Sequence, residues 1–173
     1  TASHLPFNRN GFKFFDKTGG LERADITEIL RSAAAQQTTG EHNSPKCRSF
    51  DLIARYSKHL QDAIRKGLSF HAEKPLAHLK IAVDAGNGAG GFFAEQVLKE
   101  LGADTSGSRF LDPDGTFPNH IPNPENKAAM EAAKTATVQS RSDLGLIFDT
   151  DVDRMSAVLA NGTEVNRDAI IAM

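Results

Sequence analysis

The sequence has little of several features that mark particular protein classes. Its 173 residues include one cysteine, Cys47, so no disulfide can form within the chain, and we expect a reducing, cytoplasmic setting. No apolar run approaches the roughly 20 residues that span a membrane. The six histidines show no metal-ligand spacing. A formal net charge of −2 gives no indication of binding to nucleic acid or to an anionic membrane.

The rest of the composition suits one or two compact α/β domains, with 39% hydrophobic residues. Apolar periodicity predicts helices at residues 21–36, 50–66, 92–101 and 126–137, and strands at 11–15, 79–83, 144–148 and 155–159. The pattern changes after residue 74, where we predict a domain boundary. Beyond it, strand, glycine-rich turn and helix follow one another as in half of a βαβ unit. The Asn161-Gly162 pair predicts a hairpin turn.

The first loop, TASHLPFNRNGFK, gathers groups that can take part in phosphoryl transfer. Ser3 offers a hydroxyl, and His4, Arg9 and Lys13 offer cations or hydrogen-bond donors nearby. Phosphoryl transfer needs an acceptor oxygen with positive charge close to the developing equatorial oxygens. A simple polar turn would explain the same residues. No G-x-S-x-G motif surrounds Ser3, which argues against an α/β-hydrolase.

Three aspartates alternate in DTDVDR, directly after the apolar run LGLIF. Asp149, Asp151 and Asp153 can therefore point the same way, and they repel one another unless a cation lies among them. Ligands that are all oxygen suit a hard ion such as Mg²⁺, Mn²⁺ or Ca²⁺. An EF-hand would need glycine and glutamate where Arg154 and Ala160 stand, so that class is excluded. A solvated acidic turn is the alternative.

The turn Gly86–Gly91 matches the G-x-G-x-x-G pattern of dinucleotide-binding proteins, between a predicted strand and a predicted helix. Asp84 weakens this interpretation, because it would place a negative charge close to a pyrophosphate. The alternative is that the glycines allow a tight turn to pass close to a neighbouring segment.

Taken in order, these segments resemble the α-D-phosphohexomutase superfamily, in particular its phosphomannomutase/phosphoglucomutase type. TASHLPFNRNGFKFF is similar to the family's phosphoserine loop, usually TASHNP followed by NGxK. VDAGNGAGG resembles the start of its second domain, PDGTFPNHIPNPE its FPNHxPxP segment, and DTDVDR its metal loop, usually DGDGDR. Leu5 replaces the usual asparagine. Thr150 and Val152 replace the two glycines, which puts the usual backbone geometry of the metal loop in question.

The resemblance implies three-layer α/β/α domains with mixed sheets. It assigns residues 1–74 to the latter part of the first of four domains, 75–163 to the second, and 164–173 to the entry into the third. The chain is then expected to be a fragment whose partners are the remaining domains of a parent chain. We expect the fragment alone to be inactive.

The resemblance also implies the chemistry. It makes Ser3 the phosphorylated serine, and it makes Asp149, Asp151 and Asp153 the ligands of one Mg²⁺, together with a phosphoserine oxygen. The implied enzyme is an intramolecular phosphotransferase of carbohydrate metabolism. It interconverts hexose 1-phosphates and hexose 6-phosphates, with hexose 1,6-bisphosphate as intermediate and activator.

Three further residues acquire roles by the same resemblance: His4, Lys13 and Arg154 surround the transferring phosphoryl group. Lys13 is expected to transfer a proton, and His4 to orient the loop. Two other classes stay open: a nucleotide-binding domain that uses Gly86–Gly91, and a mutase-derived module without catalysis.

Overall fold

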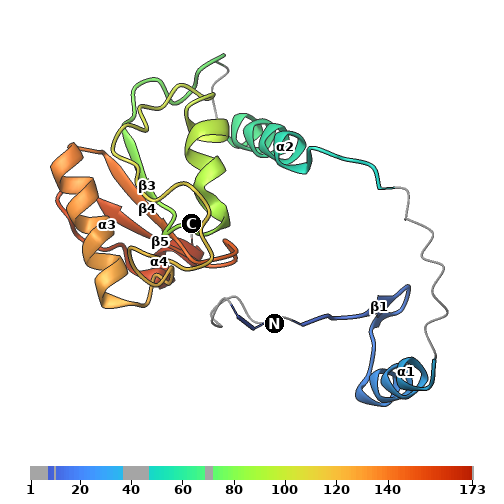
Figure 1. Ribbon diagram of the computed structural model, residues 1–173. Coiled ribbons are helices and arrows are strands. Elements are labelled where there is room, and N and C mark those ends of the chain that lie inside the picture. The colour runs from blue at the N-terminus through green and yellow to red at the C-terminus, as the bar shows by residue number, and fades with distance from the viewer. Residues whose placement is uncertain (1–7, 10, 37–46, 69–71, 173) are drawn as a thin grey trace. The chain divides into compact units, whose positions relative to one another are not determined.

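The computed structural model describes residues 8–9, 11–36, 47–68 and 72–172, and these fall into two compact units. One unit comprises the described residues from Asn8 to Phe50, and the other those from Asp51 onward (Figure 1). The boundary predicted near residue 75 stays a prediction about the domains of a longer protein. Within the described residues, no helix is both long and apolar enough to cross a membrane.

The first unit holds one short hairpin and one helix. Strands β1 (Phe15–Asp16) and β2 (Gly19–Gly20) pair antiparallel, and the Asp16 carboxylate accepts the backbone N–H of Thr18 at 2.7 Å in their turn. The strand predicted at 11–15 is therefore wrong except at Phe15, because the partner strand offers only two residues. Helix α1 (Arg23–Ala35) confirms the predicted helix, and none of its residues is buried.

The second unit is built on one mixed sheet of three strands, in the order β3 (Ile81–Asp84), β4 (Leu144–Phe148) and β5 (Met155–Leu159). Strand β3 runs parallel to β4, and β5 runs antiparallel to it. The predicted strands at 144–148 and 155–159 are confirmed residue for residue, and the one at 79–83 overlaps β3. The segment from Asp104 to Arg109 covers the outer edge of β3, where the Arg109 N–H donates to the Val83 carbonyl at 2.8 Å.

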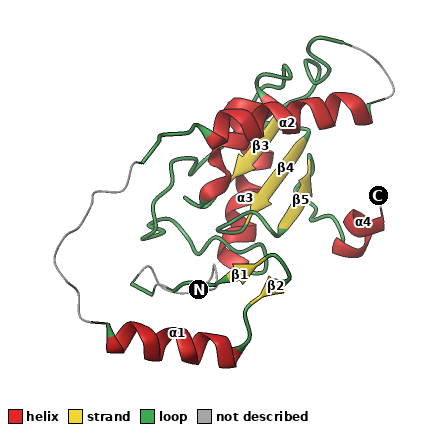
Figure 2. Ribbon diagram, turned by 90° about the vertical axis from the view of Figure 1, so that its right-hand side faces the viewer, coloured by secondary structure: helices red, strands yellow, loops and turns green. Residues whose placement is uncertain are grey.

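Helical layers cover both faces of this sheet (Figure 2). Side chains alternate along β4, so that Phe148 belongs to a buried cluster with Val97, whereas Ile147 packs with Met130 and Ala133 of helix α3 (Lys127–Ser140). Burial on both faces explains why the strand reads as a nearly continuous apolar run. The three-layer α/β/α arrangement with a mixed sheet is confirmed.

The segment after the glycine turn is helical, as predicted, but it is not a regular α-helix. A 3₁₀ turn, η1 (Ala89–Gly91), leads into a π-helix, η2 (Phe93–Leu98). The π-helical pattern is seen in the hydrogen bond from the Lys99 N–H to the carbonyl of Ala94, five residues earlier, at 3.0 Å. Its apolar positions still reach the core, since Val97 is completely buried.

Helix α2 (Leu52–Gly67) confirms the helix predicted at 50–66. It begins at Asp51, whose carboxylate accepts the Ala54 N–H at 2.9 Å. It packs on η2, where the Gln61 amide donates to the Gln96 carbonyl at 2.7 Å. The helix therefore belongs to the second unit.

The chain leaves β5 through the predicted hairpin turn. Gly162 has a φ of +83°, and its N–H donates to the Leu159 carbonyl at 2.8 Å. Residue Glu164 then pairs back with Val158, and a short helix, α4 (Arg167–Ala172), follows.

Candidate metal centre

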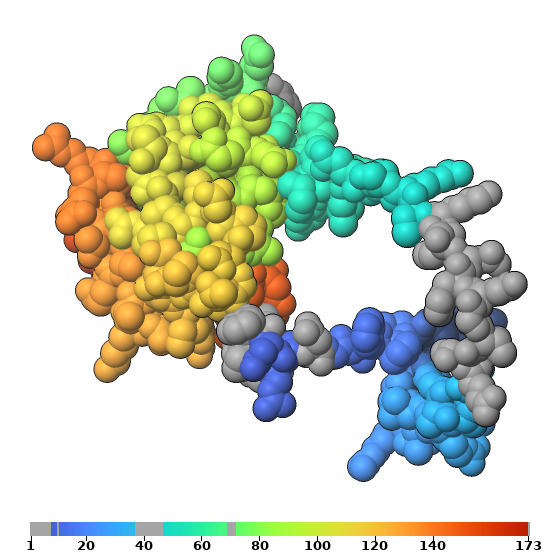
Figure 3. All heavy atoms as spheres, in the orientation of Figure 1, coloured from blue at the N-terminus to red at the C-terminus, as the bar shows by residue number. Residues whose placement is uncertain are grey.

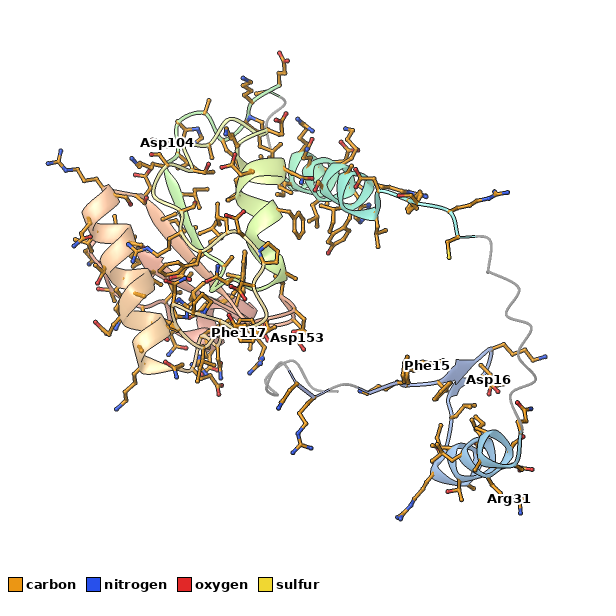
Figure 4. All side chains as sticks on the ribbon, in the orientation of Figure 1. Phe15, Asp16, Arg31, Asp104, Phe117 and Asp153 are labelled. Atoms are coloured by element: carbon orange, nitrogen blue, oxygen red, sulfur yellow. The ribbon has the colours of Figure 1, made fainter. Side chains whose placement is uncertain are left out.

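The three alternating aspartates lie on the loop between β4 and β5. Asp149 is buried, whereas Asp151 and Asp153 are exposed. One carboxylate oxygen of each lies within 4.8 Å of those of the other two, so a single cation can contact all three. Figure 4 labels Asp153, the last of the three.

Arg154 fixes the first of these carboxylates. Its backbone N–H donates to Asp149 Oδ1 at 3.1 Å, and its Nε donates to Oδ2 at 3.0 Å. Its Nη2 lies 2.8 Å from the same Oδ2, and its Nε lies 3.5 Å from the nearer oxygen of Asp153. Arg154 therefore orients the buried carboxylate of Asp149 and keeps it ionised.

The pKa values in the loop move in opposite directions. Burial raises the pKa of Asp149, but hydrogen bonds from Arg154 and Asp153 outweigh that effect and leave its pKa lowered. The hydrogen bond with Asp149 and its negative charge raise the pKa of Asp153. Ionisation of both carboxylates is therefore unfavourable, and a cation between them would stabilise the doubly ionised pair.

The donor set fits a hard divalent ion. Three carboxylates and one guanidinium leave two uncompensated negative charges in the loop. The two positive charges of one Mg²⁺ would balance them. Each carboxylate oxygen has two lone pairs, so Asp149 can accept from Arg154 and still bind a cation. Side-chain ligands that are all carboxylates favour Mg²⁺, Mn²⁺ or Ca²⁺ over softer metals.

The loop's backbone is strained at one of its two unusual residues. Val152 has a φ of +66°, which is an outlier for a β-branched residue. Thr150 is not among the described residues with positive φ. The concern raised by the two missing glycines is therefore confirmed at Val152 alone.

We expect Val152→Gly to raise the free energy of unfolding by about 1 kcal/mol, because glycine adopts left-handed φ values without the cost of a Cβ. Chemical denaturation of the chain and of the variant measures the change. Val138→Gly is the matched control, since Val138 is also exposed but lies in α3. The control should lose stability, and an equal loss at Val152 would contradict the assignment of strain.

The glycine-rich turn lies against protein, as the packing interpretation predicted. A Cβ added at Gly88 would lie 2.8 Å from the Thr150 carbonyl oxygen, and one at Gly90 would lie 3.0 Å from Val152 Cγ2. One at Gly91 would collide with the Leu111 backbone. The glycines therefore make room for the metal loop and for the edge segment, which explains them without a nucleotide.

A groove of about 670 Å³ opens beside the loop, bordered by Gly88, Thr150 and Phe117. The charged side chains among its described lining residues are all acidic: Glu95, Asp112 and Asp114. Because a phosphate would be repelled there, we do not assign the phosphate of a substrate to this groove.

A sequence model of the family described as "Phosphoglucomutase/phosphomannomutase, alpha/beta/alpha domain II" matches residues 54–162. That range includes the whole sheet, the glycine turn and the aspartate loop. The chain belongs to this family. The phosphohexomutase resemblance of the sequence motifs is thereby confirmed.

Relatives within the family carry several names. The chain is 32% identical to a phosphoglucomutase of Neisseria meningitidis serogroup A over 168 residues, which are 97% of this chain and 34% of that protein. It is 35% identical over 184 residues to a phosphoglucosamine mutase of Sulfurovum, covering 100% of this chain and 38% of the relative. It is 30% identical over 173 residues to a phosphomannomutase/phosphoglucomutase of Pseudomonas aeruginosa, covering 100% and 35%.

A solved structure agrees with these sequence matches. A phosphoglucomutase/phosphomannomutase family protein from Burkholderia thailandensis superposes with a TM-score of 0.57 and 29% identity, over 70% of this chain and 24% of that one. The chain spans about a third of the length of the curated relatives it matches.

The structure brings together only some of the residues that the phosphohexomutase motifs single out. Asp149, Asp151, Asp153 and Arg154 meet in one loop. Ser3 and His4 lie outside the described residues. Lys13 is exposed in the first unit, and its predicted role stays a prediction.

The sequence analysis missed a buried pair in the family's other two motifs. Asp84, from VDAGNGAGG, lies 2.9 Å from His120, from the FPNHxPxP segment. The two residues are 36 positions apart, so no local pattern could have paired them. The one indication in the sequence was that both residues belong to motifs of the same family.

Proposed function

We propose that this chain carries the phosphoserine loop and the metal loop of an α-D-phosphohexomutase. The parent protein interconverts hexose 1-phosphates and hexose 6-phosphates through a phosphoserine and a hexose 1,6-bisphosphate. The observation that carries the proposal is the convergence of three carboxylates after β4, inside the region that matches the family's second domain. The names of the relatives support a sugar phosphate as the substrate.

In the proposed reaction, the phosphorylated oxygen of Ser3 gives its phosphoryl group to a free hydroxyl of the hexose phosphate. The bond from phosphorus to the serine oxygen breaks, and a bond to the sugar oxygen forms. Lys13 takes up the proton that the hydroxyl loses and passes it to the serine oxygen as that oxygen leaves. The bisphosphate then reorients in the site. Ser3 accepts the other phosphoryl group, and the proton of its hydroxyl goes to the sugar oxygen that is released.

The protein's own residues prepare this site for charge. We propose that Asp149, Asp151 and Asp153 hold one Mg²⁺, which offsets negative charge on the transferring phosphoryl group. Arg154 keeps the buried Asp149 ionised and oriented, while 41% of the Arg154 side chain stays exposed. His4 orients the serine loop.

The metal assignment is tested by Asp151→Asn. The change removes a charged ligand without altering its size, so we expect Mg²⁺ affinity to fall tenfold or more, that is by about 1.4 kcal/mol or more. Isothermal titration calorimetry of the 173-residue chain measures this. Asp168→Asn is the control, because Asp168 is an exposed carboxylate of α4, outside the metal loop.

Equal Mg²⁺ affinity in Asp151→Asn and in the unchanged chain would show that the aspartates form a solvated acidic turn. Equal losses in Asp151→Asn and in the control would show only a general effect of net charge.

A further inference from the structure

His120 has an unusual environment for a histidine. Its side chain is only 5% exposed. Ring atom Nε2 lies 2.9 Å from Asp84 Oδ1, and Nδ1 lies 3.1 Å from the Ile121 carbonyl oxygen. A backbone carbonyl and an ionised carboxylate are both acceptors, and the protonated imidazolium can donate to both at once.

The buried charge of Asp84 is compensated by the imidazolium of His120. The Asp84 side chain is 1% exposed, and its Oδ2 finds no hydrogen-bond donor among the described residues. Its Oδ1 accepts both the ring of His120 and the backbone N–H of Gly86, the latter at 3.0 Å. A buried carboxylate without a partner is strongly destabilising, so the imidazolium compensates a charge that is otherwise stranded.

The loop that contains His120 contacts the glycine turn at two more points. A Cβ added at Gly86, whose φ is +53°, would lie 2.7 Å from Pro122 Cβ and 3.0 Å from the ring of His120. The amide of Asn119 donates to the side-chain oxygen of Asn87 at 2.7 Å. The loop that contains these residues, 112–125, lies across the face of the second unit shown in Figure 3 (yellow to light orange).

The glycine turn in turn supports the metal loop. The Ala89 N–H donates to the Thr150 carbonyl at 2.8 Å, and Gly88 lies against the backbone of Thr150. Gly90 lies against the side chain of Val152. Thr150 and Val152 alternate with the three aspartates, so the position of the turn fixes the backbone from which all three ligands project.

We propose that His120 is a positioning residue for the cation site: as an imidazolium held on Asp84, it locks the glycine turn that carries the metal loop. This inference rests on the proposed role of Asp149, Asp151 and Asp153 as metal ligands. Among the described residues, no hydrogen bond or ion pair joins His120 to the three aspartates, and its effect passes through Asp84, Gly86 and Ala89.

The ion pair between His120 and Asp84 depends on pH in a definite direction. The hydrogen bond to Asp84 raises the pKa of His120, against smaller opposing effects of burial and of the nearby Arg109. Since the pKa of His120 in the folded protein lies above the usual 6.5, the ion pair is fully formed below that pH. It weakens as the pH rises through the raised pKa. Mg²⁺ affinity should therefore fall over that range.

The experiment compares the unchanged 173-residue chain with His120→Gln and with the double variant Asp84→Asn/His120→Gln. The control is His78→Gln, at an exposed histidine. Calorimetric titration with Mg²⁺ from slightly acidic to alkaline pH is the readout, and circular dichroism checks folding. We expect His120→Gln to bind Mg²⁺ about tenfold more weakly, the lower end of the effect of a group that supports metal ligands, and the control to bind unchanged.

The double variant replaces the ion pair by a neutral hydrogen-bonded pair, so it keeps the inference testable if His120→Gln does not fold. It should fold, recover part of the affinity, and lose the fall of affinity at high pH. Equal affinity in His120→Gln and the unchanged chain, or the same pH profile in the double variant, would overturn the inference alone. A lack of Mg²⁺ binding by the unchanged chain would overturn the proposed metal site and this inference with it.

Discussion

Ser3→Ala in the parent protein should abolish the interconversion of hexose 1-phosphates and hexose 6-phosphates, with a loss of at least about 10³-fold in rate. The serine oxygen is the atom that gives and takes back the phosphoryl group in the proposed reaction, and alanine has no substitute for it. General acid–base groups and the metal would remain, but they would have no phosphoryl acceptor to assist.

A coupled assay with glucose 1-phosphate and a trace of glucose 1,6-bisphosphate measures this loss. Because the relatives are named for glucose, mannose and glucosamine phosphates, all three sugar phosphates should be assayed. Ser49→Ala is the control, at an exposed serine of the first unit, and it should keep full activity. Activity retained by Ser3→Ala would rule out the phosphoserine mechanism.

The second large effect concerns the 173-residue chain by itself. We expect it to show negligible mutase activity, on the order of 10³-fold or more below the parent protein, because catalysis depends on holding the sugar phosphate in line with Ser3. The chain spans only about a third of the relatives it matches. By the family resemblance, the loops that bind the sugar and the distal phosphate lie in the remainder.

The same coupled assay tests this expectation, with the parent protein as the positive control. Mg²⁺ binding by the 173-residue chain, measured on the same sample, would show that its metal loop is formed even where the assay finds no turnover. Turnover by this chain close to that of the parent would show that residues 1–173 contain the whole active site.

Much of the second unit could be predicted because its elements are set by local sequence. Strands β4 and β5 are apolar runs bounded by an aspartate-rich loop and by an Asn-Gly turn, and both were predicted residue for residue. The strand predicted at 11–15 was wrong except at Phe15, because strand pairing depends on the partner and only Gly19–Gly20 pairs there. The π geometry of η2 was also missed, since apolar spacing reports which side chains are buried and not which carbonyl each N–H reaches.

The candidate metal centre was predicted in its ligands but not in its support. Alternation alone placed Asp149, Asp151 and Asp153 together. The contact between His120 and Asp84 joins segments far apart in the chain, so only the folded structure brings it out. The packing of the glycine turn against Thr150 has the same origin.

The most direct test of the proposed phosphoserine chemistry is the position of a phosphate in the parent protein after incubation with glucose 1,6-bisphosphate and Mg²⁺. Mass spectrometry of the intact protein and of its peptides gives that position. The account predicts one added phosphate on Ser3, which forms much more slowly in Asp151→Asn. A protein that gains no phosphate, or that gains it at another residue while Ser3 stays unmodified, would contradict it.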